Sequence, residues 1–271
     1  MAESHNRPTQ PGRREFLKRA GLLGLGAAGI AAGGAGWWHR QSPDPIKVGV
    51  LHSLSGSMAI SETSLCDAAL LAIEELNAAG GVLGRPVQAV VEDGASSPAV
   101  FRSQCAALLS QERVCSIFGG WTSACRKAML PVLDHYNGLL WYPVQYEGNE
   151  CTRSVIYTGS TPAQQISPAV QWLLRNGHRR FYLLGSDYVF PRTANRIVNA
   201  VLAEEGHHAV GEDYVALGAR DFAATVARIR AARPDVVFST INGSSNRAFY
   251  RQFRNAGLAA ATLPIMATSV A

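Results

Sequence analysis

The sequence predicts an α/β protein made of two lobes, each a doubly wound parallel sheet with helices on both faces. From residue 46 onward, short apolar runs rich in β-branched residues alternate with segments of helical periodicity. The alternation starts again after about residue 160. A single sheet of about nine or more parallel strands would be unusual. We therefore expect a first lobe over residues 45–160 and a second over 161–271.

The first lobe is expected to open with a strand over 46–52, which is apolar and β-branched. A helix over 64–79 should follow, because Ser64 and Asp67 form a capping box and Gly80-Gly81 ends the periodic run. Pro98 should open a helix that runs to about residue 113, and another is expected over 123–136 although Pro131 should kink or shorten it. The remaining strands of this lobe are expected at 86–93, 114–120, 138–144 and 154–160.

The second lobe repeats the pattern. Its first helix should end at Asn176-Gly177, its second at Gly206 and its last at Gly257, since glycine is the usual residue just after a helix. The helices are expected at 162–176, 191–205, 221–232 and 244–256. The strands are expected at 179–187, 208–217 and 234–242, with one more opening in LPIMATS at 263–269.

Residues 1–44 are predicted to be an export leader and linker rather than part of the fold. Arg13 and Arg14 stand before Phe16, Leu17 and Lys18, and an uncharged stretch follows over 20–38. This pattern resembles a twin-arginine signal. A membrane helix is the alternative, but seven of those 19 residues are glycine, which favours neither a helix nor membrane insertion.

Net charge and cysteine content exclude several classes. The formal charge is +5, but the first 40 residues hold six Lys/Arg and two Asp/Glu, so the remainder carries only 19 minus 18, or +1. A nearly neutral fold does not predict a nucleic-acid partner. The five cysteines show no metal-type spacing, and most of them are expected in the core; Cys105, for example, shares a helical face with Phe101 and Leu108.

The candidate site lies in the loops that follow the strands, because ligands of open parallel sheets bind beyond the carboxyl ends of the strands. These loops are rich in hydroxyls, amides and aromatic rings and poor in charge, as suits a small neutral polar molecule. Thr122 and Ser123 could instead only cap their helix, and Tyr142 and Tyr188 could be packing residues.

Catalysis is not predicted, and neither a metal nor a cofactor is expected. LHSLSGS is not a nucleophile elbow, no Asp is placed in sequence to orient His52, and that histidine is expected to be satisfied by backbone. The GLGAAG of the leader follows no strand, so it does not indicate dinucleotide binding.

Five segments together resemble the urea-binding component of an ATP-driven urea importer and the related short-chain-amide sensor. They are IKVGVLHSLSGSMA, AIEELNAAGGVLGRPV, GGWTSACRKAMLPV, LLWYPVQYEG and GSDYVFPRTAN. Both relatives are type I periplasmic binding proteins, a group that also contains branched-chain amino acid binders. The resemblance covers about residues 46–271.

The resemblance implies two lobes that close on the ligand, a periplasmic location and delivery to ABC permease subunits in the membrane. Family members are longer and return to the first lobe, so it also implies that the second lobe is incomplete here. The ligand-binding residues that it and the loop pattern indicate are Trp121, Thr122, Ser123, Tyr142, Gln145, Tyr188, Asn242 and Ser55.

Three other functions stay open. An amide-sensing regulator would share the fold and the pocket. A branched-chain amino acid binder needs an acidic partner for the ligand ammonium, for which Asp187 is available in the sequence. An amide hydrolase would need a nucleophile–base pair that the sequence does not offer. Among urea, formamide and acetamide the choice is also open, because one small group changes binding by only about 1–3 kcal/mol.

Overall fold

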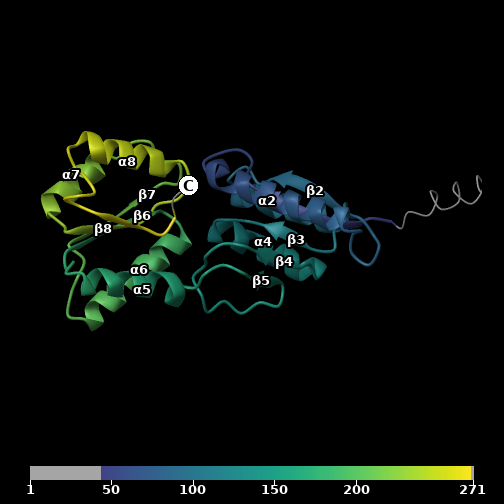
Figure 1. The fold of residues 1–271 in the computed structure, drawn as a ribbon, viewed down its shortest axis with the longest axis horizontal. Coiled ribbons are helices and arrows are strands. Elements are labelled where there is room, and N and C mark those ends of the chain that lie inside the picture. The colour runs from purple at the N-terminus through teal and green to yellow at the C-terminus, as the bar shows by residue number, and fades with distance from the viewer. Residues whose placement is uncertain (1–43, 270–271) are drawn as a thin grey trace, which may run out of the picture. The chain divides into compact units, whose positions relative to one another are not determined.

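The computed structural model describes residues 44–269, which form nine strands in two parallel sheets with helices on their faces (Figure 1). Every strand pairing in both sheets is parallel. The predicted α/β fold is thereby confirmed. The predicted twin-arginine motif lies outside the described residues. Across residues 44–269, no helix is both long and apolar enough to cross a membrane.

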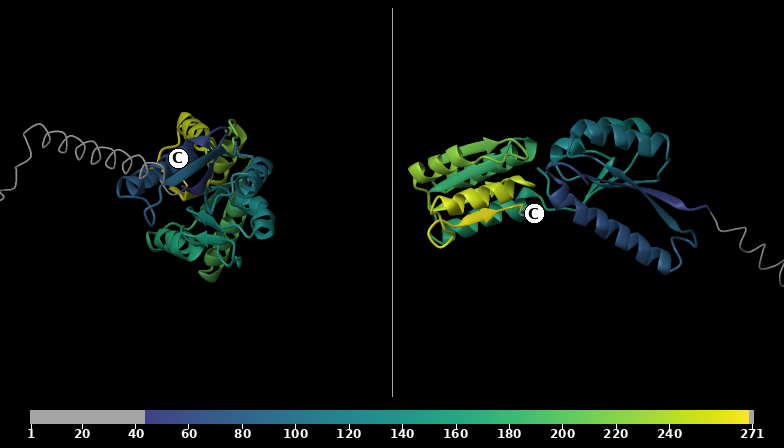
Figure 2. Two further views of the ribbon diagram at one scale, coloured as in Figure 1. Left: turned by 90° about the vertical axis from the view of Figure 1, so that its right-hand side faces the viewer. Right: turned by 90° about the horizontal axis from the view of Figure 1, so that it is seen from above.

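The first sheet has the strand order β2-β1-β3-β4-β5. The helices α3 and α4 pack together against one face, and α2 runs along the other (Figure 2, right). The buried core under α3 and α4 includes Phe101, Leu108, Met129 and Leu133. The strands are β1 (Ile46–His52), β2 (Val87–Asp93), β3 (Ile117–Gly119), β4 (Leu140–Tyr142) and β5 (Val155–Tyr157), and the helices are α2 (Ala59–Ala78), α3 (Pro98–Ser110) and α4 (Ser123–Tyr136).

The second sheet has the order β7-β6-β8-β9 and a separate core on each face. The helices α5 and α6 cover one face, and α7 and α8 cover the other (Figure 1). The strands are β6 (Phe181–Ser186), β7 (Gly211–Val215), β8 (Val236–Thr240) and β9 (Ile265–Ala267), and the helices are α5 (Pro162–Arg175), α6 (Val189–Glu204), α7 (Ala223–Ala232) and α8 (Ser245–Asn255). The predicted lobe boundary at 160 falls in the loop between β5 and α5.

Helix α2 begins five residues before the predicted start, and the predicted capping box at Ser64 and Asp67 is wrong. Ser64 lies inside the helix, where its hydroxyl donates to the carbonyl of Ser61 at 3.2 Å. The first turn forms instead on the backbone carbonyl of the buried Met58, which accepts from the N–H groups of Ser61 at 2.9 Å and Glu62 at 3.0 Å. The earlier start turns Glu62 into a first-turn residue of the helix.

Strand β3 is shorter than predicted, and its end depends on a glycine. A Cβ placed on Gly119 would stand 1.9 Å from the carbonyl oxygen of Leu51 on β1, so no side chain fits there. The next N–H, of Gly120, donates to that same carbonyl at 2.9 Å. This close approach sets the direction in which the chain leaves the sheet toward Trp121.

The cysteines follow the core interpretation in three of five cases. Cys66, Cys105 and Cys125 are buried, and Cys105 shares the packed face of α3 with Phe101 and Leu108, as predicted. Cys115 and Cys151 are exposed, and all five are free thiols.

Candidate ligand-binding site

The predicted site residues lie just beyond the carboxyl ends of strands in both sheets. Trp121 and Thr122 follow β3, and Gln145 follows β4, whose last residue is Tyr142. In the second sheet, Tyr188 follows β6 and Asn242 follows β8. The parallel topology therefore brings each set to one edge of its own sheet.

The N-terminus of α4 forms the centre of the first set. Thr122 is its N-cap, and its Oγ1 accepts from the N–H of Cys125 at 3.2 Å. Thr122 and Ser123 are both buried, at 3% and 1% exposure, so their polar atoms can face only protein or a bound molecule. Thr122 thus does cap its helix, and the positive end of the helix dipole lies at the same place.

Tyr142 connects β4 to this turn. Its side chain is fully buried, and its hydroxyl donates to the carbonyl of Trp121. Burial raises the pKa of Tyr142 above its usual value, although the charge of Arg126 opposes the shift. The phenol therefore remains a neutral hydrogen-bond donor at physiological pH.

Behind Ser123 lies a group that the sequence analysis missed, here called the Arg126 cluster: Arg126 with Glu147, Glu150 and the tyrosines at 142, 146 and 157. The guanidinium is fully buried and donates to Ser123 Oγ at 3.0 Å, to Glu147 at 2.7 Å and to Glu150 at 2.5 Å. It also lies 4.7 Å from the ring centroid of Tyr142, 5.9 Å from that of Tyr146 and 5.5 Å from that of Tyr157. The cluster holds the β4–β5 loop against α4 and fixes the Ser123 side chain.

Within residues 44–269, three hydrogen bonds join loops of the first sheet to loops of the second. The indole Nε1 of Trp121 donates to Asn242 Oδ1 at 3.4 Å, and the N–H of Ser244 donates to the carbonyl of Ser57 at 2.9 Å. The side-chain amide of Gln145 donates to the hydroxyl of Ser269. Trp121, Gln145 and Asn242 therefore take part in contacts between the two sheets' loops.

Tyr188 is the N-cap of α6, a helix that contacts α4. Burial raises the pKa of Tyr188 well above its usual value, and Tyr142, Glu147, Cys125 and Glu62 raise it further in that order. These four groups are thus within electrostatic reach of the Tyr188 phenol. Tyr188 therefore stands at the start of a helix that packs against α4.

Two residues considered from sequence do not join this group. Ser55 is exposed, and its hydroxyl and N–H both donate to Asp93, at 2.6 and 3.2 Å. Asp187 is also exposed and accepts from Arg192 Nε at 2.7 Å, a hydrogen bond that lowers the pKa of its carboxyl. Asp187 is therefore engaged in an exposed ion pair with Arg192.

His52 does have an acidic neighbour, contrary to the sequence interpretation. Its Nδ1 lies 3.4 Å from Glu62 Oε2, and the same oxygen accepts from the N–H of Ser53 at 2.8 Å. Glu62 is fully buried, and its other oxygen, Oε1, has no hydrogen-bond partner among the described residues. Glu62 comes four residues after Met58, so a helix start at Ala59 predicts it in the first turn of α2, near the end of β1.

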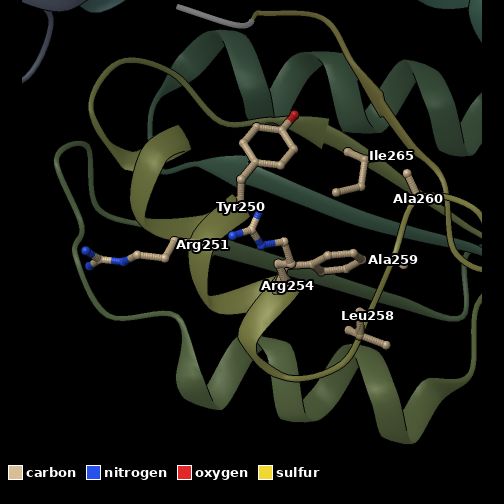
Figure 3. Close-up of a pocket in the computed structure, with 8 residues that line it drawn as sticks. Tyr250, Arg251, Arg254, Leu258, Ala259, Ala260 and Ile265 are labelled. Atoms are coloured by element: carbon tan, nitrogen blue, oxygen red, sulfur yellow. The ribbon is translucent and has the colours of Figure 1, made fainter.

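A cavity of about 600 Å³ lies elsewhere, between α8 and the loop that leads into the edge strand β9 (Figure 3). None of the predicted site residues lines it. Its walls are Tyr250, Arg251, Phe253, Arg254, Leu258, Ala259, Ala260 and Ile265. Within residues 44–269, no group of three or more His, Cys, Asp or Glu side chains could hold a metal ion.

Comparison with known proteins defines the class. Residues 46–271 match the model of the periplasmic binding protein domain family, so the chain belongs to that family. A Leu/Ile/Val-binding protein, BraC3 of Rhizobium johnstonii, is 25% identical over 198 residues, which cover 71% of this chain and 53% of that protein. The chain thus spans about half the length of this curated relative.

Solved structures agree on the fold. A solute-binding protein of an ABC transporter from R. palustris, crystallised with 4-hydroxybenzoate, is 24% identical with a TM-score of 0.72, over 83% of this chain and 62% of that one. The branched-chain amino acid binding protein LivJ of Streptococcus pneumoniae, crystallised with isoleucine, is 21% identical with a TM-score of 0.71, over 82% of this chain and 64% of that one. At these identities the likeness establishes the type I periplasmic binding protein fold.

Proposed function

We propose that this chain is the ligand-binding part of a solute-binding protein that captures urea or a short-chain amide in the periplasm for import by an ABC permease. Export would use the predicted twin-arginine leader. The observation that supports the proposal is that uncharged polar residues gather at the α4 N-terminus and Tyr142, while Tyr188 begins the helix that packs on α4. A neutral amide presents one carbonyl and at least two N–H groups, which such a set can pair without a counter-charge.

Capture is proposed to work by closure of the two lobes, 45–160 and 161–271, over the ligand. The loops of the two sheets already contact each other through Trp121–Asn242 and Ser57–Ser244. A ligand that binds both sides favours the closed arrangement, so binding shifts the population toward it. The permease would then recognise the closed form. No covalent step is required.

The relatives' ligands differ from the proposed one. The R. palustris protein holds 4-hydroxybenzoate and LivJ holds isoleucine, and both ligands carry a carboxylate. A buried carboxylate needs a cation or several N–H donors. Here the buried Arg126 is already paired with Glu147 and Glu150. Arg126 is therefore engaged within the protein, so a ligand carboxylate would depend on the N–H groups at the α4 N-terminus.

Amino acid binding is the second candidate, and one observation supports it. Glu62 offers a buried carboxylate that could pair with an ammonium group in place of Asp187. The regulatory amide sensor shares the pocket, but the predicted export leader argues against a cytoplasmic role.

Calorimetric titration of the full chain with urea, formamide, acetamide, leucine and 4-hydroxybenzoate tests the proposal. We expect urea or an amide to bind. Ser123→Ala should weaken the affinity for that ligand about tenfold, because it removes one hydrogen bond of about 1–1.5 kcal/mol. The matched control, Ser55→Ala, should leave affinity unchanged because Ser55 faces Asp93. Tight binding of leucine with no response to any amide would eliminate the proposal.

A further inference from the structure

We infer that Glu62 is a ligand-recognition residue, whose unpaired carboxylate oxygen accepts a hydrogen bond from an N–H group of the bound molecule. The ligand class is then restricted to compounds with such a group, amides and ureas or amines, and excludes simple carboxylates. This inference deepens the proposed function and rests on it for the location of the site.

The position of the Glu62 side chain is fixed by its other oxygen. Oε2 accepts from the N–H of Ser53 at 2.8 Å and lies 3.4 Å from Nδ1 of His52. The backbone of Glu62 is held as well, because its N–H donates to the carbonyl of Met58 at 3.0 Å. With the backbone and one oxygen fixed, the carboxylate has a single orientation in which Oε1 is the free end.

The free oxygen is costly unless something binds to it. Glu62 is fully buried, and Oε1 has no partner among the described residues. A buried acceptor left unpaired loses the hydrogen bonds that water would give it, and a charged one loses more. Arg126 does not compensate, since its own hydrogen bonds go to Glu147, Glu150 and Ser123.

Glu62 lies among the predicted site residues rather than apart from them. Burial raises the pKa of the Cys125 thiol to about 12, with Thr122 opposing and Glu62 adding to the shift. Cys125 is in the first turn of α4, where its N–H meets Thr122. The charge of Glu62 also contributes to the raised pKa of Tyr188, after burial and three larger charge effects.

Helix α2 also contacts strand β3, whose last residue, Gly119, comes just before Trp121 and Thr122. Ser57, which precedes the Met58 that holds the Glu62 backbone, accepts from the N–H of Ser244 in the second sheet. Glu62 therefore lies in a helix turn that borders loops of both sheets.

A second buried polar group lies in the same turn of α2. The hydroxyl of Ser61 is also buried and unpaired, at 5% exposure for the residue, in the same first turn of α2. A hydroxyl can donate where a carboxylate can only accept. A primary amide offers N–H groups that an unpaired carboxylate oxygen can accept. Acetate, which has the same shape, offers no N–H group and would place a second negative charge beside Glu62.

The test is Glu62→Gln. Ser53 must still donate its N–H to the side chain, so the glutamine oxygen stays at the Oε2 position and the NH₂ group takes the place of Oε1. The substitution thus converts the free acceptor into a donor without changing the shape. Glu74→Gln, on the exposed part of the same helix, is the matched control.

Binding of acetamide and of acetate would be measured by calorimetry on the full chain for the wild type and both variants. We expect Glu62→Gln to weaken acetamide binding about 10- to 100-fold, as for the loss of a charged hydrogen bond, and to lower the acetamide-to-acetate affinity ratio at least about tenfold. Glu74→Gln should change neither. If Glu62 only shaped the Ser53 loop, both ligands would weaken together, and an unchanged ratio would overturn the inference while leaving the amide function standing.

A second ligand pair separates the two proposals. If the wild type binds leucine but no amide, the proposed function fails, and the same comparison is made with leucine and 4-methylpentanoate, which lacks the ammonium group. If Glu62→Gln lowers the ratio of leucine affinity to 4-methylpentanoate affinity at least tenfold, the inference is still supported. A wild type that binds only carboxylates overturns it. Should Glu62→Gln not fold, as judged by circular dichroism, Glu62→Asp is used; it keeps the charge but withdraws the oxygens, and an unchanged ratio overturns the inference.

Discussion

Replacing Arg126 by methionine should destabilise the folded protein far more than replacing its neighbour Lys127. Methionine keeps most of the length of the side chain but removes the guanidinium. That group is fully buried and makes two ion pairs, with Glu147 at 2.7 Å and Glu150 at 2.5 Å. Without it, the carboxylates, only 11% and 13% exposed, keep their charges with little access to water.

The size of the effect follows from this burial. Removing one partner of a buried ion pair costs about 3–5 kcal/mol, mostly because the other charge remains buried without compensation. For a domain of this size each 1 kcal/mol lowers Tm by about 2–4 °C, so Tm should fall by roughly 6–20 °C. Lys127 makes its pair with the same Glu150, at 3.0 Å, but is 45% exposed. Its loss should cost less than about 1 kcal/mol.

Urea unfolding and thermal melting of wild type, Arg126→Met and Lys127→Met would measure the difference. Adding Glu147→Gln and Glu150→Gln to Arg126→Met should recover part of the loss, because the buried charges are then gone. If Arg126→Met were no more destabilising than Lys127→Met, the reasoning from burial would be refuted.

Three further predictions follow from particular residues. Gly243→Ala should lower both Tm and ligand affinity, because its φ is +63° and the new Cβ would stand 2.4 Å from the carbonyl oxygen of Ser57. Gly257→Ala, where φ is +78° and no atom lies within 4 Å of the new Cβ, should lower Tm only. Equal losses of ligand affinity in the two variants would contradict this prediction. Burial opposes ionisation of Glu150, but hydrogen bonds from its cationic neighbours lower its pKa overall. The ionised carboxylate therefore contributes its full stabilisation above the ordinary glutamate pKa of 4.5, and this stabilisation is lost as pH falls through the lowered pKa. Unfolding free energies measured across acid pH should therefore fall less steeply in Glu150→Gln, and an unchanged slope would count against the pairing. Thiol labelling of the native protein should modify two cysteines quickly and three only on unfolding, since burial raises the pKa of two of the three to about 12; fast labelling of more than two would refute the core assignment of Cys66, Cys105 and Cys125.

The sequence predicted the order and type of every strand and helix in the described residues, because these depend on local periodicity and on glycine and proline punctuation. Helix α4 has the predicted bounds, Ser123–Tyr136, even with Pro131 inside it. Strand ends were less accurate: the predicted strand over 114–120 is only Ile117–Gly119, because pairing with β1 decides which residues belong to the sheet.

The positions of the candidate site residues at the sheet edges could be predicted for a similar reason. Position after a strand places Thr122, Tyr142 and Asn242 at sheet edges whatever else they contact. Position does not tell which polar atoms find partners. Ser55 is bound by Asp93, 38 residues away, and could not be excluded from the sequence.

What the sequence alone determined is the alternation that makes two parallel sheets, and with it the loops in which a binding site must lie, since both follow from short-range patterns. What only the tertiary structure decided is the electrostatics of those loops. It paired Arg126 with Glu150 across 24 residues and left one oxygen of Glu62 buried and, among the described residues, unpaired. The physical reason is that the energy of a charge depends on its burial and its neighbours, and both are set by segments that meet only when the chain folds.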